Sequence, residues 1–196
     1  MKQITCGFIG LGLIGGSIAK ALKEKRNNIT VHACDKNQDT LLLAKKEGIA
    51  DSISPLPDET LAECDILFLC APVSHNDENL RQIAAFLPKD CILTDVGSVK
   101  TGIHRQVSAL GLEHLFIGGH PMAGSERCGY ANSKAQLLEN AYYILTPTSS
   151  VSDEKLQLYR ELVSSMGALP LVLPFDTHDY VTAAVSHLPH VIASSL

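Results

Sequence analysis

A short glycine-rich segment near the start of the chain constrains the fold more than any other feature. Gly10, Gly12 and Gly15 stand in the spacing GxGxxG, between an apolar run at residues 6–9 and an amphipathic stretch at residues 18–22. Gly10 allows a tight turn from strand to helix, Gly12 lets the backbone approach a pyrophosphate, and Gly15 permits close packing of helix on sheet. The phosphates would meet the positive end of the helix, so the segment predicts a dinucleotide-binding unit.

An acidic residue further along the chain indicates which dinucleotide is bound. Asp35 ends a second apolar run at residues 29–34 and stands 20 residues after Gly15. A carboxylate at this place holds a ribose 2′-hydroxyl and repels a 2′-phosphate, which favours NAD. Lys36 follows directly, and its positive charge leaves NADP open as the alternative.

Apolar runs alternate with helical patterns along most of the chain. This alternation predicts an α/β fold of the Rossmann type, with a mainly parallel sheet and helices on both faces. Strands are expected at residues 4–9, 30–34, 66–71, 91–95, 115–118, 142–145 and 169–173. Helices are expected at residues 41–47, 76–86, 101–110 and 153–166. In such sheets ligands sit beyond the carboxyl ends of the strands, so the residues after each strand are candidates for the site. The predicted cofactor-binding residues are Gly10, Gly12, Leu13, Ile14, Gly15, Asp35, Lys36, Ala71, Pro72, Val73 and Ser98.

Composition excludes several classes of function. The 196 residues include 16 Lys and Arg against 21 Asp and Glu, a net charge of −5 without a basic run, which argues against nucleic-acid or anionic-membrane partners. No apolar stretch approaches the roughly 20 residues that span a bilayer, and no signal peptide is recognisable, so we expect a cytoplasmic protein. The six cysteines are scattered without metal-ligand spacing and are expected in the core, so no metal site is predicted.

The pattern changes after residue 173. Residues 1–173 are predicted to form the NAD-binding domain, and residues 174–196 to begin a second domain. Residues 179–196 have a helical pattern that ends without a Gly or Pro stop signal. A long terminal helix packed on another subunit would explain this, but we favour a chain that is cut from a longer protein.

His120 is the strongest candidate for a catalytic residue. It stands after a glycine pair and before Pro121, where the backbone is expected to turn at the end of a strand. Dehydrogenases need an acceptor for the hydroxyl proton as the hydride departs, and imidazole has a suitable pKa. Ser98 could hydrogen-bond the other ring nitrogen, and capping of a helix from Val99 onward is an equally plausible role for its hydroxyl.

Two further histidines lie in the C-terminal helical pattern. His187 and His190 are three residues apart, which places them on one face of a helix. Pro189 between them removes a backbone hydrogen bond and is expected to bend the helix. A bend beside two histidines is typical of a site, with a buried structural pair as the alternative.

Four segments in this order resemble the prephenate and arogenate dehydrogenase family. They are GLGLIGGS, DVGSVK, GGHPMAGSE and SHLPH, and they extend over essentially the whole chain. The resemblance implies a nucleotide-binding domain followed by an all-helical domain that forms a homodimer, with substrate bound between the two. It implies that His120 accepts a hydrogen bond from the substrate's ring hydroxyl and that Ser98 orients His120. It also implies that Ser125, Glu126, His187 and His190 line or gate the substrate pocket.

The resemblance further implies a reaction. NAD would take a hydride from the carbon that bears the ring hydroxyl of prephenate, and loss of CO2 would give 4-hydroxyphenylpyruvate, a step of tyrosine biosynthesis. An arogenate dehydrogenase is the alternative within the family. An NAD-binding regulatory module without turnover is the alternative from another class, because the substrate-binding arginine of the family's helical domain is not in this chain.

Overall fold

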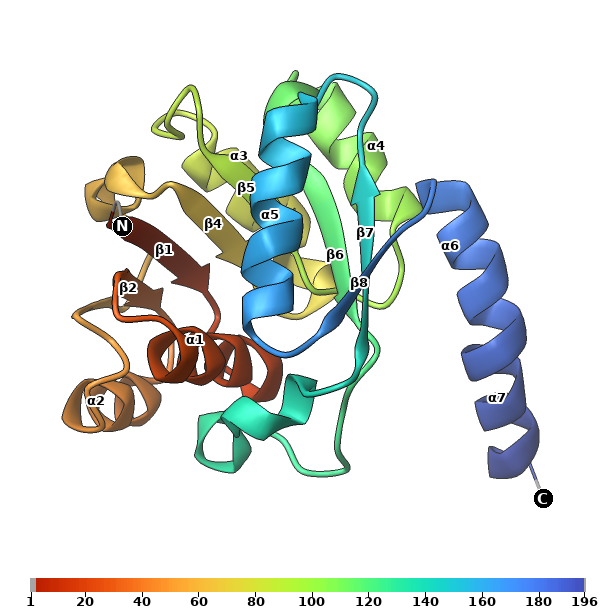
Figure 1. The fold of residues 1–196 in the computed structure, drawn as a ribbon, viewed down its shortest axis with the longest axis horizontal. Coiled ribbons are helices and arrows are strands. Elements are labelled where there is room, and N and C mark those ends of the chain that lie inside the picture. Colours follow the sequence, from red (N-terminus) through yellow and green to blue (C-terminus); the bar gives the residue numbers. More distant parts are fainter. Residues whose placement is uncertain (1–2, 196) are drawn as a thin grey trace.

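The computed structural model describes residues 3–195, apart from the side chain of His190. Two sheets run through it (Figure 1), with the strand orders β3-β2-β1-β4-β5 and β6-β7-β8. The strands are β1 (Ile4–Ile9), β2 (Ile29–Cys34), β3 (Ser52–Ser54), β4 (Ile66–Leu69), β5 (Ile92–Asp95), β6 (Ile117–Pro121), β7 (Tyr142–Pro147) and β8 (Leu169–Val172). The helices are α1 (Leu13–Lys25), α2 (Gln38–Lys46), α3 (Asn76–Ile83), α4 (Thr101–Ala109), α5 (Asp153–Ser165), α6 (Phe175–Thr182) and α7 (Leu188–Ser194).

The first sheet is parallel throughout, as the alternation of strands and helices predicts. A parallel bridge between Leu93 and Phe116 joins it to the second sheet, in which β6 pairs antiparallel with β7. β7 pairs parallel with β8. The order β3-β2-β1-β4-β5 is the nucleotide-binding arrangement of a Rossmann-type fold, so the predicted fold class is confirmed.

Helices cover both faces of the sheets because the strands are apolar on both sides. In β4, Ile66 and Phe68 face one core cluster, and Leu67 and Leu69 face the other. The first cluster includes side chains of α1, α2 and α5, and Figure 1 shows α1 and α5 on the near side of the sheets. The second includes side chains of α3 and α4. This two-sided burial is the usual state of a parallel strand and explains its continuous apolar run.

Two strands differ from the sequence-based expectation. β3 was not expected, because a three-residue edge strand of sequence SIS carries no recognisable pattern. β6 begins and ends later than the predicted 115–118, so His120 lies inside the strand and not in a loop after it. The strand continues through Gly118 and Gly119 because β7 pairs with this whole segment, with His120 opposite Ile144.

The C-terminal segment forms an arm that projects from the body in Figure 1. Its helix begins at Phe175, four residues before the predicted start, and is interrupted by a π-helical turn at Ala183–His187. In this turn the amide of Leu188 bonds the carbonyl of Ala183. Pro189 has no amide hydrogen for a regular helical bond, so the expected disturbance takes the form of a π-turn.

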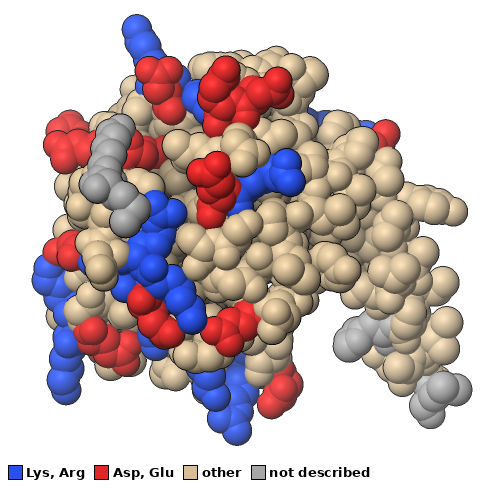
Figure 2. Space-filling model, in the orientation of Figure 1, with Lys and Arg blue, Asp and Glu red and all other residues tan. Residues whose placement is uncertain are grey.

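The surface of the arm differs from that of the body. Charged side chains of both signs are spread over the body in Figure 2, whereas residues 183–195 contain no Lys, Arg, Asp or Glu. Within residues 3–195 no helix has both the length and the apolar character required to cross a membrane.

Candidate active site

The carboxyl ends of neighbouring strands bring the predicted site residues to one edge of the fold. β1, β4 and β5 are parallel, so the turns that follow them lie at the same edge. The bridge from Leu93 to Phe116 shows that β6 runs in the same direction as β5. His120, near the end of β6, therefore lies on the same edge as the glycine turn that follows β1.

The glycine turn has the geometry that its three glycines were expected to supply. Gly10 adopts φ +90°, and a Cβ there would lie 2.6 Å from the backbone nitrogen of Ala71. A Cβ at Gly15 would lie 2.9 Å from Cβ of Cys70, so α1 packs closely on the strand ends. Among the described residues nothing lies within 4 Å of a Cβ at Gly12, which leaves open space at the start of α1. No side chain of residues 3–195 caps this helix, and its first turn carries no acidic residue, as an anion-binding helix terminus requires.

A cavity of about 300 Å³ opens beside this turn. Asp35 lies in its wall, with Oδ2 accepting the amide hydrogen of Leu11 at 2.7 Å and Oδ1 that of Asn37 at 2.8 Å. Both bonds fix the orientation of the carboxylate. The cavity is lined by Ile9, Gly10, Gly12, Cys34, Asp35, Lys36, Pro55, Leu56, Pro57, Cys70, Ala71, Pro72, His75, Glu78, Asn79 and Gln82.

The predicted cofactor residues other than Ser98 fall into two groups. Gly10, Gly12, Asp35, Lys36, Ala71 and Pro72 line the cavity. Leu13, Ile14 and Gly15 form the start of α1, and Val73 lies against the turn after β5, where a Cβ at Gly97 would be 2.9 Å from its Cγ2. Pro55, Leu56 and Pro57, in the loop after β3, form part of the same wall.

A buried ion pair holds β5, β6 and the start of α4 together. Nζ of Lys100 lies 2.5 Å from Oδ2 of Asp95 and donates to the carbonyl of Gly119 at 2.8 Å. Oδ1 of Asp95 accepts the amide hydrogen of Gly119, and Oδ2 accepts that of Gly97. Both charged side chains are almost completely buried. The pair thus fixes the position of the strand segment that carries His120.

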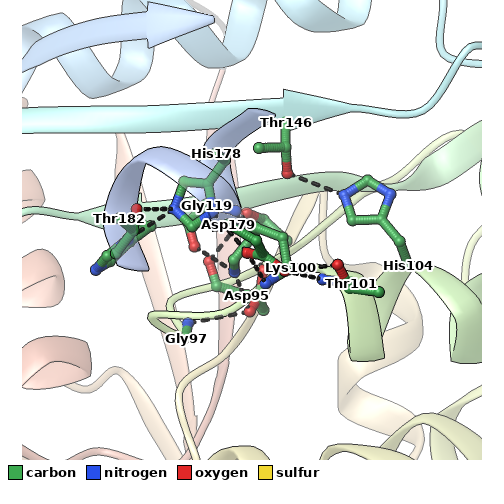
Figure 3. Close-up of polar contacts among 12 residues, drawn as sticks. Asp95, Gly97, Lys100, Thr101, His104, Gly119, Thr146, His178, Asp179 and Thr182 are labelled. Carbon is green, nitrogen blue, oxygen red and sulfur yellow. Dashed lines mark hydrogen bonds and ion pairs between the residues drawn. The ribbon is translucent and has the colours of Figure 1, made fainter. Parts of the chain in front are cut away.

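A second acidic residue joins the arm to the body (Figure 3). Asp179, on α6, accepts the amide hydrogens of Lys100 at 2.7 Å and Thr101 at 2.8 Å, and also the hydroxyl hydrogen of Thr101. It therefore caps α4 from another helix. The alternative role of Ser98 as the cap of a helix from Val99 onward was wrong, because α4 begins at Thr101 and Asp179 provides the acceptor.

The ring of His120 has a different partner from the one expected. Its Nδ1 lies 2.8 Å from Nε2 of His178, and the two rings meet edge to face. The Ser98 side chain is exposed, and within residues 3–195 it makes no hydrogen bond with His120. Since Nδ1 is already bonded, Nε2 is the nitrogen of His120 that remains for a ligand.

Burial and neighbouring charges tune the ionisation of this cluster. Burial, together with the charges of His178, Lys100 and His187, lowers the pKa of His120 to about 4. His120 is therefore neutral at physiological pH and able to accept a proton. The partial burial of Asp179 raises its pKa, but the hydrogen bonds from Thr101, His178 and Lys100 outweigh this effect and lower the pKa to about 2.

The predicted substrate residues are only partly brought together. Ser125 and Glu126 lie in the exposed loop after β6, where the Ser125 hydroxyl donates to Glu126 and accepts the amide hydrogen of Arg127. His187 is half-buried and lies close enough to influence the charge state of His120. The backbone of His190 belongs to α7, and its side chain lies outside the described part of the structure.

Four residues of this cluster were not recognised as site residues in the sequence. They are Asp95, Lys100, His178 and Asp179. Asp95 and Lys100 do begin and end the DVGSVK segment, so an acid at a strand end followed by a lysine was an available signal. His178 and Asp179 stand 58 and 79 residues from their partners, and no local pattern connects them.

These features define the class of the protein as a Rossmann-type nucleotide-binding domain, with a histidine at the edge of the sheet where the nucleotide turn lies. The sequence profile described as "Prephenate dehydrogenase, nucleotide-binding domain" matches residues 18–171. The chain therefore belongs to the prephenate dehydrogenase family.

Individual relatives agree with this assignment. The chain is 42% identical to the prephenate dehydrogenase of Lactococcus lactis subsp. cremoris, over 100% of this chain and 53% of that protein. A crystal structure of prephenate dehydrogenase from Aquifex aeolicus, in complex with hydroxyphenyl propionate and NAD+, superimposes with a TM-score of 0.90 at 30% identity, over 100% of this chain and 68% of that one. Arogenate dehydrogenase from Synechocystis also gives 0.90, at 32% identity, over 98% and 67%. The chain spans about half the length of the curated relatives it matches.

The buried ion pair gives a prediction for stability. Lys100→Met leaves the carboxylate of Asp95 buried without its partner, and we expect the free energy of unfolding to fall by about 3–5 kcal/mol. Asp95→Asn combined with Lys100→Met should cost less than the sum of the two single changes. Lys25→Met, which breaks an exposed pair with Glu139, is the matched control and should cost far less than Lys100→Met. Urea unfolding measures all four variants, and an equal loss for Lys100→Met and Lys25→Met would contradict this role.

The lowered pKa values of two buried histidines, His104 and His120, predict how stability depends on pH. Burial lowers the pKa of both His104 and His120 to about 4, against about 6.5 in the unfolded chain. As pH falls below about 6.5 the unfolded state binds protons first, so the free energy of unfolding should decrease between pH 6.5 and 4. The contribution of Asp179 is present above about pH 4 and lost as pH falls towards 2.

Urea unfolding at a series of pH values tests this expectation. The range from pH 6.5 to 5 isolates the histidines, because ordinary carboxylates titrate lower. His104→Gln should reduce the slope in this range, since it removes one of the two groups. A free energy of unfolding that stays constant from pH 6.5 to 5 would show that the buried histidines titrate normally in the folded protein.

Proposed function

We propose that this protein is an NAD-dependent prephenate dehydrogenase, which converts prephenate to 4-hydroxyphenylpyruvate by oxidative decarboxylation in tyrosine biosynthesis. The observation that carries the proposal is the placement of His120. A neutral imidazole, whose Nε2 makes no hydrogen bond within the described residues 3–195, lies at the sheet edge where the glycine turn opens its cavity. The 42% identity to a prephenate dehydrogenase over the whole chain supports the same reaction.

The residues of the cavity fit NAD. The open space at Gly12 leaves room for a pyrophosphate at the uncapped start of α1, and Asp35 presents a fixed carboxylate to a ribose. Ala71 and Pro72 would hold the cofactor from the side of β4. When bound, NAD supplies the hydride acceptor of the reaction. The NAD+ complex of the Aquifex relative supports this choice of cofactor.

The chain's own contribution to the chemistry is to position the substrate and to hold one proton. Nε2 of His120 would accept the hydrogen bond of the ring hydroxyl and then its proton, as the hydride leaves the carbon that bears this hydroxyl. Loss of CO2 returns the electron pair of the broken C–C bond to the ring and yields a phenolate. The proton held by His120 is the one this phenolate oxygen needs, so the imidazole is restored and no metal is required.

The remaining predicted residues complete the proposed site. We place Ser98 beside the nicotinamide, with its exposed hydroxyl available to cofactor or substrate. Ser125 and Glu126 would form the polar rim, and His187 and His190 would line the substrate pocket on the arm. The half-buried position of His187 near His120 supports this arrangement.

The proposal extends to the organisation of the whole protein. Residues 1–173 would form the NAD-binding domain, and residues 174–196 would begin a helical domain that forms a homodimer. Val185, Leu188, Val191 and Ile192 support this, because each is more than half exposed on the arm. The six free cysteines fit work in the reducing cytoplasm, and the acidic net charge fits small-molecule partners in preference to nucleic acid or membranes.

The direct test uses the full-length protein with NAD and either prephenate or arogenate. We expect NADH to form, followed by its absorbance, and the faster substrate identifies the activity. His120→Asn keeps a polar group at the position of Nδ1 and removes the one at Nε2, so turnover should fall at least about 100-fold. The affinity for NAD should change little.

Each outcome of this experiment has a definite meaning. A higher rate with arogenate would make the protein an arogenate dehydrogenase, as in the Synechocystis relative. NAD binding without turnover of either substrate would favour a nucleotide-sensing module. A parallel loss of NAD binding and turnover in His120→Asn would make His120 structural.

Cofactor selectivity follows from the orientation of Asp35. We expect NADP to bind at least about tenfold more weakly than NAD, because the 2′-phosphate would meet the carboxylate. Asp35→Asn keeps an oxygen for the Leu11 amide and removes the charge, so it should reduce this difference. Calorimetry with both cofactors measures it. Tighter binding of NADP by the unchanged protein would show that Lys36 or Asn37 dominates the ribose site.

A further inference from the structure

Two consecutive residues of α6 form a hydrogen-bonded chain that ends at His120. Nδ1 of His178 lies 2.8 Å from Oδ1 of Asp179, and Nε2 of His178 lies 2.8 Å from Nδ1 of His120. His178 is buried, and both of its ring nitrogens are engaged. Figure 3 shows His178 and Asp179 beside Lys100 and Thr101 at the start of α4.

The acidic end of this chain has a fixed polarity. Asp179 receives hydrogen bonds from the amides of Lys100 and Thr101 and from the hydroxyl of Thr101, all of which are donors. A carboxylate with so many donors remains ionised and can only accept. Nδ1 of His178 must therefore carry a hydrogen and donate it to Asp179.

The position of the hydrogen on His178 determines which ring nitrogen of His120 carries a hydrogen. A neutral imidazole that is protonated at Nδ1 has an unprotonated Nε2, which accepts a hydrogen bond. The Thr182 hydroxyl, 3.4 Å away, can also donate to this nitrogen. His120 must then donate from Nδ1, which leaves its Nε2 without a hydrogen. This is the less common tautomer of a neutral histidine in water. The hydrogen bonds that run from Asp179 through His178 therefore select it.

We propose that His178 and Asp179 are positioning residues that hold His120 in the tautomer with a free Nε2 and stabilise the imidazolium that forms when His120 takes the substrate proton. The inference rests on the proposed dehydrogenase function and assigns a part in it to two residues that do not touch the substrate. When the proton reaches Nε2, the hydrogen bond from Nδ1 to His178 strengthens, because its donor is now charged. The carboxylate of Asp179 lies at the other end of the chain as the compensating charge. A buried carboxylate acts on an imidazole in the same way in serine proteases.

Burial of two histidines bonded to a partly buried carboxylate argues against a role in packing alone. Polar side chains lose their hydration when they are buried, and an apolar pair of similar volume would fill the space between β6 and α6 without that loss. Asp179 caps α4 with or without His178, so the cap does not explain the second histidine. A neighbouring buried histidine, His104, shows the structural alternative, because its Nε2 bonds the Thr146 hydroxyl and its ring stacks on Phe175.

The first experiment determines the tautomer of His120 directly. Long-range nitrogen-proton NMR of the full-length protein with 15N-labelled histidine, near pH 8, distinguishes protonation at Nδ1 from protonation at Nε2. We expect His120 and His178 both to carry the proton on Nδ1. His120→Asn and His178→Gln assign the signals by their disappearance. A His120 ring protonated at Nε2 would overturn the proposal, whether or not the protein is active.

The second experiment measures turnover in a graded pair of variants. His178→Gln can place its side-chain oxygen near the position of Nε2 and so retain an acceptor for His120, whereas His178→Leu fills the space without one. We expect kcat to fall by less than about tenfold in His178→Gln and by about 10²–10³-fold in His178→Leu, with the KM for NAD within about threefold. In His178→Leu the tautomer signal of His120 should also shift towards protonation at Nε2.

A matched control separates this effect from loss of packing. His104→Gln removes a buried histidine of the same region that does not belong to the hydrogen-bonded series of Asp179, His178 and His120. It should lower thermal stability while kcat stays within about threefold. A folded His178→Leu protein that keeps kcat within threefold and an unshifted His120 signal would overturn the proposal. If His178→Leu does not fold, a loss of more than 100-fold in folded His178→Gln would contradict it. Absence of any turnover in the unchanged protein would refute the proposed function. The tautomer measurement would still show whether the hydrogen bonds from Asp179 and His178 set the tautomer of His120.

Discussion

The buried contact between Lys100 and Asp95 is the interaction on which the rest of the site depends. One ammonium group joins the end of β5, the start of α4 and the carbonyl of Gly119 on β6, and it does so where both charges are shielded from water. It fixes the junction of two sheets, which the backbone bridge between Leu93 and Phe116 and a shared apolar core also join. Because His120 follows Gly119 directly, this contact also fixes the position of the imidazole at the edge of the sheet.

The fold separates two tasks at that edge. The turn after β1 needs backbone amides, space and an acidic residue for a nucleotide, and glycines with a fixed Asp35 provide them. The end of β6 needs a proton acceptor in a defined state, and side chains from a distant helix provide it. The proposed oxidation by hydride transfer requires both at one place, because the hydride and the hydroxyl proton would leave neighbouring atoms of the substrate. The nucleotide turn and His120 lie close together because the parallel strands that carry them end at the same edge of the fold.

The sequence predicted the parts of this arrangement that depend on local patterns. The glycine turn, Asp35, the parallel sheet and the start of α5 at Asp153 follow from spacing and periodicity within a few residues. The partner of His120 could not be found in this way. Ser98 was chosen because it is near the end of a strand, yet His178, which is 58 residues away, holds the ring. The position of His120 inside β6 was missed for the same reason, since glycines and a proline are typical of loops unless a neighbouring strand satisfies their backbone groups.

In the proposed reaction Nε2 of His120 meets the substrate hydroxyl, while Nδ1 of His120 stays hydrogen-bonded to His178. A crystal structure of the full-length protein with NAD and a hydroxyphenyl substrate analogue tests it most directly. We expect a distance of about 2.6–3.2 Å between Nε2 and the ligand hydroxyl, with the nicotinamide on the opposite side of the ligand ring. A His120 ring turned inward, with its Nε2 bonded within the protein and no contact to the ligand, would contradict it.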